Sequence, residues 1–158
     1  MDSQPAFNWH PGLMLPKAKM QPPFYADLVT GADPTSRFSF MNYLKTTGKL
    51  FRFAINESFF PYRSEFNAYC QWVANQLPNL QFGSSVELVQ YDLVRQLYRI
   101  FVTHEATNHT TSLFARNLVL GIGSEPHLPD CVRDLHHPNI FHAAEYLRHK
   151  HAASELQT

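Results

Sequence analysis

The sequence lacks an excess of charge of either sign, a long apolar run and more than two cysteines. Its 158 residues hold 13 Lys and Arg against 13 Asp and Glu, which argues against a strongly basic surface for nucleic acid. No apolar run approaches the roughly 18 residues of a membrane-spanning helix, and no apolar signal region follows Met1. We therefore expect a cytoplasmic protein that partners neither nucleic acid nor membrane.

The two cysteines, Cys70 and Cys131, suit a reducing compartment. The helical setting of Cys70 favours a buried thiol, with a single disulfide as the alternative. Glycine is also scarce, with six residues in all. The only close pair, Gly121-x-Gly123, has no third glycine, so these residues hold no complete G-x-G-x-x-G turn of the kind that binds a pyrophosphate at a helix N-terminus.

What the sequence does have is aromatic and apolar residues, at 14% and 44% of the composition, which argue for a packed core. They begin in residues 8–24, where four prolines remove backbone donors and predict an extended, turning loop. The loop nevertheless carries several large apolar side chains. These are Trp9, Leu13, Met14, Leu15, Met20 and Phe24. Long loops of this kind are usually packed on the protein and often functional, although covering the core is the simpler alternative.

Two helices are expected next. Asp33-Pro34-Thr35-Ser36 is typical of a turn that enters a helix, and the apolar residues from Phe38 to Leu44 predict a short buried helix that stops at Gly48. We expect an irregular or short extended connector over residues 50–60. Over residues 64–77 apolar residues recur at helical spacing, which predicts an amphipathic helix with its apolar face in the core, ended by Pro78.

Beyond residue 80 the apolar period changes from helical to alternating. Segments 80–82, 85–92, 97–104 and 112–120 carry β-branched and aromatic residues and are divided by polar turns. We expect one strand that joins a larger sheet, a small antiparallel meander, and a final buried strand over residues 117–123.

Three blocks of the sequence share the motifs of one family. The first runs from Trp9-His10-Pro11-Gly12 through Met20-Gln21 and Phe24-x-x-Asp27-Leu28 to Asp33-Pro34-Thr35-Ser36. The second is Phe60-Pro61-x-Arg63-x-Glu65-Phe66-x-x-Tyr69-x-x-Trp72. The third is Leu118-Val119-Leu120-Gly121-x-Gly123-x-x-Pro126-x-x-Pro129. In order and spacing they resemble the flavin-dependent N-monooxygenases of hydroxamate siderophore biosynthesis, which are the lysine, ornithine and diamine N-hydroxylases.

The resemblance implies an α/β fold, namely a partial FAD-binding domain of the two-dinucleotide, Rossmann-like type with a small antiparallel β meander. Residues 1–130 would form this domain without its first Gly-rich βα unit, and residues 131–158 would begin the connection to a missing NADPH domain. The full-length enzyme would use FAD, NADPH and dioxygen to hydroxylate a primary amine, with a homo-oligomer left open. We expect the 158-residue chain alone to be inactive.

The resemblance also assigns roles to single residues. Asp2 stands where the family has the acid that accepts hydrogen bonds from the adenosine ribose, and the backbone at Val86 where the adenine is contacted. Trp9 and His10 are placed against FAD. Gln21 lines the flavin and substrate cavity, and its amide, as donor and acceptor, suits the polar edge of the flavin ring. We therefore take Gln21 as the residue nearest the reacting centre and find no convincing general base.

Ala26 departs from the family pattern. Amino-acid hydroxylases commonly have Lys at this position, where it binds the substrate carboxylate. A substrate without a carboxylate has no use for that cation, and a buried unpaired ammonium would cost free energy. The sequence thus favours the cadaverine or putrescine branch over lysine or ornithine, with decay of a non-functional remnant as the competing explanation.

Five histidines lie near the C-terminus, and histidine is a common metal ligand. They are His136, His137, His142, His149 and His151. Neither Cys nor carboxylate accompanies them at a finger-like spacing, so we expect solvated or capping histidines and no metal site. Two alternatives to the enzyme segment remain at this stage. One is a catalytically inactive truncated remnant, and the other is a small flavin- or protein-binding module.

Overall fold

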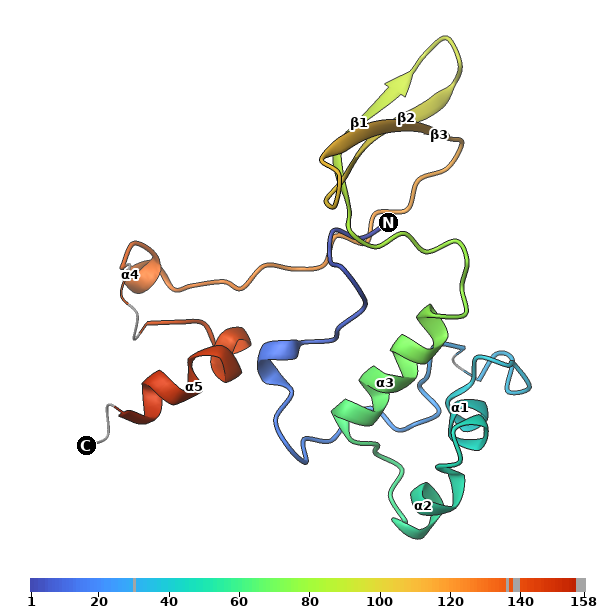
Figure 1. The fold of residues 1–158 in the computed structure, drawn as a ribbon, viewed down its shortest axis with the longest axis vertical. Coiled ribbons are helices and arrows are strands. Elements are labelled where there is room, and N and C mark those ends of the chain that lie inside the picture. Colours follow the sequence, from blue (N-terminus) through green and yellow to red (C-terminus); the bar gives the residue numbers. More distant parts are fainter. Residues whose placement is uncertain (30, 136, 138–139, 156–158) are drawn as a thin grey trace. The chain divides into compact units, whose positions relative to one another are not determined.

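The computed structural model describes residues 1–29, 31–135, 137 and 140–155, with the backbone alone for residues 151–155. It divides the chain into two compact units, each made of two separate stretches of sequence. One unit consists of Met1–Phe7 and Leu77–Ser124 and holds the β-strands. The other consists of Asn8–Gln76 and Glu125–Thr158 and holds the helices. Figure 1 draws the elements of both units.

The strand unit contains an antiparallel sheet in the order β1-β2-β3. The strands are β1 (Ser84–Asp92), β2 (Leu97–His104) and β3 (His109–Ala115). Gln96 and Asn108 adopt positive φ where the chain turns between strands, and Asn is among the residues that tolerate this conformation. Between Val86 and Leu88 the β1–β2 register shifts, so a bulge lies in β1. Val102 and Ile100 on the central strand form the buried apolar centre of this unit.

The helical unit is built around α1 (Phe40–Thr46), α2 (Leu50–Ile55) and α3 (Arg63–Ala74). Phe40 and Tyr69 are both 0% exposed, and their rings meet edge to face at 5.2 Å, a favoured aromatic geometry. Further aromatic rings surround this pair. They are Phe24, Tyr43, Phe53 and Phe66. The helical unit therefore has an aromatic core rather than an aliphatic one.

The helical unit has four further elements among the described residues. They are the 3₁₀ helices η1 (Pro11–Leu13) and η2 (Ala143–Glu145), and the α-helices α4 (Asp130–Arg133) and α5 (Tyr146–Glu155). Among the described residues, no helix combines the length and apolar character that crossing a membrane requires. Neither cysteine is in a disulfide: Cys131 is exposed and Cys70 is buried, and burial raises the pKa of the Cys70 thiol to about 11.

The structure confirms the amphipathic helix, the short buried helix and the meander. α3 covers most of residues 64–77 and buries Tyr69, Cys70 and Val73 on one face, although it ends at Ala74 rather than at Pro78. The predicted strands 85–92 and 97–104 correspond to β1 and β2. The strand expected over residues 112–120 is β3, which begins and ends earlier, at His109 and Ala115. The turn at Asp33 forms through Oδ1, which accepts from the backbone N–H of Thr35 at 3.2 Å, but α1 begins only after Ser39.

Three expectations were wrong. Residues 50–55 form α2 rather than an irregular connector, because Gly48 at φ 72° reverses the chain and Phe53 then packs on Phe40 at 5.6 Å. Residues 80–82 and 117–123 are not strands. Val119 and Ile122 are 93% and 90% exposed, and residues 117–123 have no strand partner among the described residues. A strand needs such a partner for its backbone hydrogen bonds, and apolar residues alone do not supply one.

The aromatic core yields a stability prediction. Replacing Phe40 by Ala removes a side chain that is 0% exposed, and we expect a loss of about 3–5 kcal/mol in the free energy of unfolding. Phe51→Ala is the matched control, because Phe51 lies on α2 but is 82% exposed, and its loss should stay within about 0.5 kcal/mol. Urea denaturation followed by circular dichroism measures both. Equal losses would contradict the assignment of Phe40 to the core.

Candidate functional site

The loop that carries Gln21 is held against the segment before α3. The backbone N–H of Met20 donates to the carbonyl of Pro61 at 2.8 Å, and that of Phe24 donates to Phe59 at 2.8 Å. In return the N–H of Arg63 donates to the carbonyl of Ala18 at 2.8 Å. The Met20 side chain is buried, whereas Gln21 is exposed. The pairing therefore fixes the backbone on both sides of Gln21 and leaves its amide accessible.

Arg63, the first residue of α3, lies directly beside this loop. Its Nε is buried and has no hydrogen-bond partner among the described residues. A buried guanidinium nitrogen without an acceptor costs free energy, so a hydrogen-bond acceptor from another molecule or segment would stabilise Arg63 Nε. Sequence reasoning did not select Arg63 as a site residue. The available signal was a cation inside the Phe60-Pro61-x-Arg63 motif at the start of a predicted helix.

Trp9 and His10 lie together at the start of the same loop. Their rings are 5.2 Å apart, and the indole of Trp9 also contacts Phe66 of α3 at 5.7 Å. The backbone N–H of Trp9 donates to Asn67 Oδ1 at 2.8 Å. His10 is exposed and adopts a left-handed conformation, with φ 45° and ψ 56°, which is strained for a residue with a side chain. Trp9 is thus packed on α3, and His10 faces solvent.

Gly12 lies in η1, two residues after His10, and packs closely on η2. A Cβ at Gly12 would lie only 1.9 Å from the carbonyl oxygen of Ala144. The imidazole of His142 caps η2, with Nδ1 accepting from the N–H of Ala144 at 3.1 Å. Glycine at position 12 is therefore required because only a residue without a side chain lets the two backbones approach this closely.

Ala26 sits on a second anchored part of the loop and is exposed. Next to it, the Asp27 carboxylate accepts from the N–H of Phe40 at 2.8 Å and from that of Val29 at 3.0 Å. The first of these contacts places a carboxylate at the N-terminus of α1, where the helix dipole favours negative charge. Position 26 is therefore held in a defined place although its own side chain is small.

Tyr69 completes the anchoring from α3. Its hydroxyl donates to the carbonyl of Phe38 at 2.6 Å and accepts from the N–H of Leu28 at 3.2 Å. Burial raises the pKa of the Tyr69 phenol well above its usual value, so the group stays protonated. Through one hydroxyl, α3 holds both the segment after Ala26 and the segment that leads into α1.

Asp2 and Val86 belong to the strand unit and line one pocket of about 560 Å³. The backbone of Asp2 pairs with residues 81 and 84, since its N–H donates to Gln81 at 2.9 Å and its carbonyl accepts from Ser84 at 2.9 Å. One carboxylate oxygen of Asp2 accepts from the N–H of Gln4 at 2.8 Å. Val86 lies at the bulge of β1. Chain pairing therefore brings these two predicted residues to one pocket.

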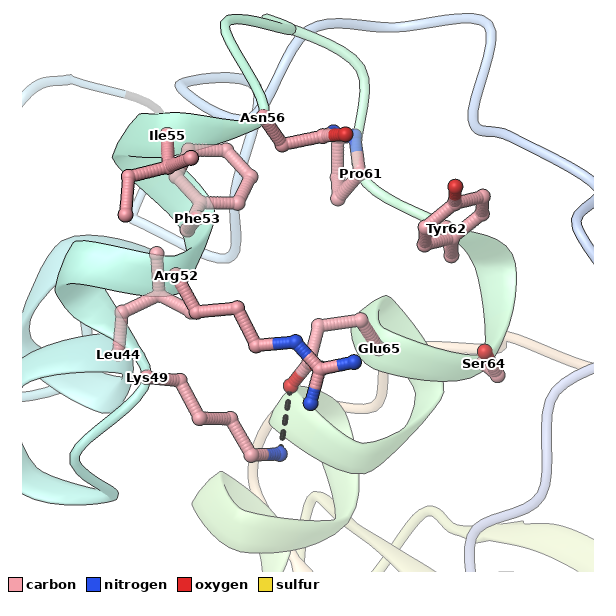
Figure 2. A pocket seen from close by; sticks show the side chains of 10 residues that line it. All are labelled: Leu44, Lys49, Arg52, Phe53, Ile55, Asn56, Pro61, Tyr62, Ser64 and Glu65. Carbon is pink, nitrogen blue, oxygen red and sulfur yellow. Dashed lines mark hydrogen bonds and ion pairs between the residues drawn. The ribbon is translucent and has the colours of Figure 1, made fainter.

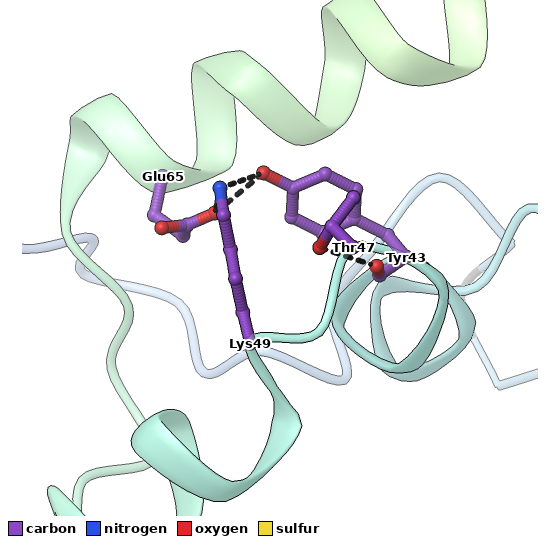
Figure 3. Close-up of polar contacts among 4 residues, drawn as sticks. All are labelled: Tyr43, Thr47, Lys49 and Glu65. Carbon is purple, nitrogen blue, oxygen red and sulfur yellow. Dashed lines mark hydrogen bonds and ion pairs between the residues drawn. The ribbon is translucent and has the colours of Figure 1, made fainter.

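A second pocket, of about 570 Å³, lies between α2 and the start of α3 (Figure 2). Lys49 and Glu65 form an ion pair at its edge, with Nζ 2.7 Å from Oε1. Figure 3 shows that Tyr43 joins them, because its hydroxyl donates to Glu65 and accepts from Lys49 at 2.8 Å. Burial opposes the charge of Lys49, but the hydrogen bonds to Glu65 and Tyr43 outweigh it and raise the pKa of the ammonium. Burial, and next the bond to Glu65, raises the pKa of Tyr43.

Three of the histidines near the C-terminus, His137, His142 and His149, line one pocket together with Glu125 and Glu145. His142 caps η2 as described, and His149 stacks on Phe141 with ring centroids 4.5 Å apart. His136 and the side chain of His151 lie outside the described residues. Within the described part of the chain, no group of three His, Cys, Asp or Glu side chains is placed to hold a metal ion.

The predicted site residues thus fall into two sets. Asp2 and Val86 lie on the strand unit, and Trp9, His10, Gln21 and Ala26 lie on the loop of the helical unit. Within the second set, Trp9 contacts His10, and Gln21 shares one anchored loop with Ala26.

Comparison with known proteins adds family evidence. The sequence profile of the family described as L-lysine 6-monooxygenase/L-ornithine 5-monooxygenase matches residues 1–158. A putrescine N-hydroxylase from Shewanella oneidensis is 42% identical over 150 residues, which are 95% of this chain and 30% of that protein. The chain therefore spans about a third of the length of the relatives that it matches.

Solved structures resemble the chain in the same way. One is the FAD-bound cadaverine monooxygenase of desferrioxamine biosynthesis from Erwinia amylovora, at 44% identity and a TM-score of 0.92 over 96% of this chain and 35% of that one. Another is an ornithine N-hydroxylase from a Kutzneria species with reduced FAD, NADP⁺ and L-ornithine, at 33% identity and a TM-score of 0.86 over 95% and 36%. The shared FAD-binding, Rossmann-like architecture confirms the predicted fold class.

The contact at Gly12 generates a prediction. Gly12→Ala should detach η2 from η1, because the new methyl group would overlap the Ala144 carbonyl, and overpacking of this kind costs about 1–3 kcal/mol. Hydrogen exchange should report it as lost protection of the Glu145 amide, which donates to the His142 carbonyl at 2.9 Å. Gly121→Ala is the control, since a Cβ there has no neighbour within 4 Å. Unchanged protection in Gly12→Ala would contradict the close packing.

Proposed function

The chain belongs to the L-lysine 6-monooxygenase/L-ornithine 5-monooxygenase family, and from this premise we propose that it is one segment of an FAD- and NADPH-dependent amine N-monooxygenase. The enzyme would hydroxylate a primary amine with dioxygen in hydroxamate siderophore biosynthesis. The observation that carries the proposal is the match over the whole chain, together with the FAD bound in the Erwinia amylovora relative.

The residues of the chain fit a flavin nucleotide. Arg63 has a buried N–H without a hydrogen-bond acceptor. A flavin nucleotide carries oxygen and nitrogen atoms that can accept such a hydrogen bond. We propose that Asp2 binds the adenosine ribose, that the backbone at Val86 contacts the adenine, and that Trp9, His10 and Gln21 contact FAD. When bound, FAD would supply the redox chemistry, with NADPH as reductant. NADPH is proposed for the full-length enzyme, as the NADP⁺ of the Kutzneria relative suggests.

The share of this chain in the reaction is positioning. The backbone around Gln21 is held by the pairs of Met20 and Phe24 with the segment before α3, so the exposed amide of Gln21 would reach the flavin edge or the amine from a fixed backbone position. We propose no general base among these residues.

For the substrate we propose a diamine such as cadaverine or putrescine. Ala26 brings no charge to a position that Asp27 and Tyr69 hold in place, and a substrate carboxylate would find no cation from this residue. The Shewanella oneidensis and Erwinia amylovora relatives are named for putrescine and cadaverine, which supports the same choice. A carboxylate left unpaired on binding would lose its hydration without compensation.

The remaining assignments stay proposals of the same kind. Residues 1–130 would be the partial FAD-binding domain and residues 131–158 the start of the connection to the NADPH domain, with a homo-oligomer left open. Two unpaired cysteines support a reducing compartment, and we propose the cytoplasm. The alternative functions, an inactive remnant or a small binding module, are separated from the enzyme by the following experiment.

A graft tests the proposed activity. Residues 1–158 replace the matching third of the Erwinia amylovora cadaverine monooxygenase, and the purified graft is assayed for bound FAD, NADPH oxidation and hydroxylamine formation. We expect FAD to copurify and diamine to be hydroxylated. The 158-residue chain alone, assayed with added FAD, is the control and should give only background. A graft that is folded and loaded with FAD but forms no hydroxylamine would establish an inactive remnant.

The substrate choice is tested in the same graft by Ala26→Lys. The new ammonium would repel the distal ammonium of a diamine and pair with an amino-acid carboxylate through a charged hydrogen bond of about 1.5–3 kcal/mol. The ratio of kcat/KM for lysine to that for cadaverine should therefore rise about tenfold to a hundredfold. The four amines cadaverine, putrescine, lysine and ornithine are compared before and after the change. A preference for lysine with Ala26 in place would overturn the diamine assignment.

A further inference from the structure

We propose that the pocket between α2 and the start of α3 binds a small monoanion with an apolar body, of the carboxylate class. None of the residues proposed for FAD or for the amine lines this pocket, so the inference does not rest on the proposed function. Its volume of about 570 Å³ lies within the usual range of small-molecule sites.

The charged side chains at the pocket leave one cation unpaired. Lys49 and Glu65 form an ion pair at 2.7 Å, and the pKa of the Lys49 ammonium is raised by its hydrogen bonds to Glu65 and Tyr43. Arg52 lines the same pocket, and its guanidinium has no ion pair or hydrogen bond to any described residue. Figure 2 shows Lys49 and Arg52 extending side by side toward Glu65. The lining thus carries a net charge of about one positive unit, located at Arg52.

The rest of the pocket is largely apolar. Leu44 and Pro61 are buried, and Phe53 packs on Phe40 in the aromatic core, so these walls are fixed by the fold. Ile55 is 80% exposed and lies at the rim with Tyr62. A ligand that covers this apolar side chain would remove its surface from water, which is favourable.

Charge and shape together select the ligand class. A guanidinium binds a carboxylate through two parallel hydrogen bonds, a geometry that an ammonium does not match. One unpaired cation compensates one negative charge, and Glu65 would repel the further charges of a polyphosphate. A neutral apolar molecule would use the walls but leave the exposed Arg52 with water as its partner. A carboxylate on an aromatic or aliphatic body satisfies both parts of the pocket.

Benzoate is the probe for this proposal. It is titrated into the isotopically labelled 158-residue chain, and amide shifts are followed by NMR, with neutral benzamide as the matched ligand. We expect saturable shifts confined to residues 49–65 and clearly weaker binding of benzamide. Arg52→Gln should weaken benzoate binding about tenfold or more, the loss of one charged hydrogen bond. Arg52→Lys should restore part of it.

Lys45→Gln controls for a general loss of positive charge, because Lys45 lies on α1 and does not line the pocket. It should leave benzoate binding unchanged. Any of three results would overturn the proposal: no saturable benzoate shifts, equal binding of benzoate and benzamide, or unchanged benzoate binding in Arg52→Gln. Tighter binding of pyrophosphate than of benzoate would overturn the assignment to a monoanion.

Discussion

The buried hydroxyl of Tyr69 is the contact on which the arrangement of the helical unit depends. One oxygen accepts from Leu28 and donates to Phe38, which ties two loop segments to the middle of α3. Loops rich in proline lack the regular backbone hydrogen bonds of helices and strands, so contacts with other segments of the chain must order them. Tyr69 supplies part of that order from a fully buried position in the aromatic core, where its ring also packs on Phe40.

This anchoring connects the fold to the proposed chemistry. Ala26 and Gln21 sit on a loop that would otherwise have many conformations, and fixing a residue in one conformation costs about 1–2 kcal/mol of backbone entropy. The contacts of Asp27, Tyr69 and the segment before α3 offset this cost when the chain folds rather than when a ligand binds. A binding loop ordered in advance gives up less free energy on association.

Sequence patterns predicted the elements whose stability is local or pairwise. The apolar period of α3 predicted a helix correctly, because the apolar residues of that period are buried on one face of α3. The alternation in β1 and β2 predicted strands correctly, because these two segments pair with each other. The pattern was misleading at residues 117–123, where an apolar run has no strand partner among the described residues, and at α2, whose helix depends on the turn at Gly48. Motifs located Gln21, Trp9 and His10 on the loop. They did not reveal that the Nε of Arg63 lacks a hydrogen-bond acceptor, because this depends on its burial in the fold, which no local pattern encodes.

The loop also contains strained residues, and a bound ligand would stabilise their conformation. His10 and Lys17 have positive φ, at 45° and 65°, and the nearby Arg63 Nε is buried without an acceptor. Conformations of this kind persist only where surrounding contacts enforce them, and they are common at functional sites. A group that accepts a hydrogen bond from Arg63 would bind the folded loop and not the unfolded chain. By mass action it would therefore raise the stability of the fold in proportion to the logarithm of its concentration, so that ligand binding and ordering of the loop are two aspects of one equilibrium.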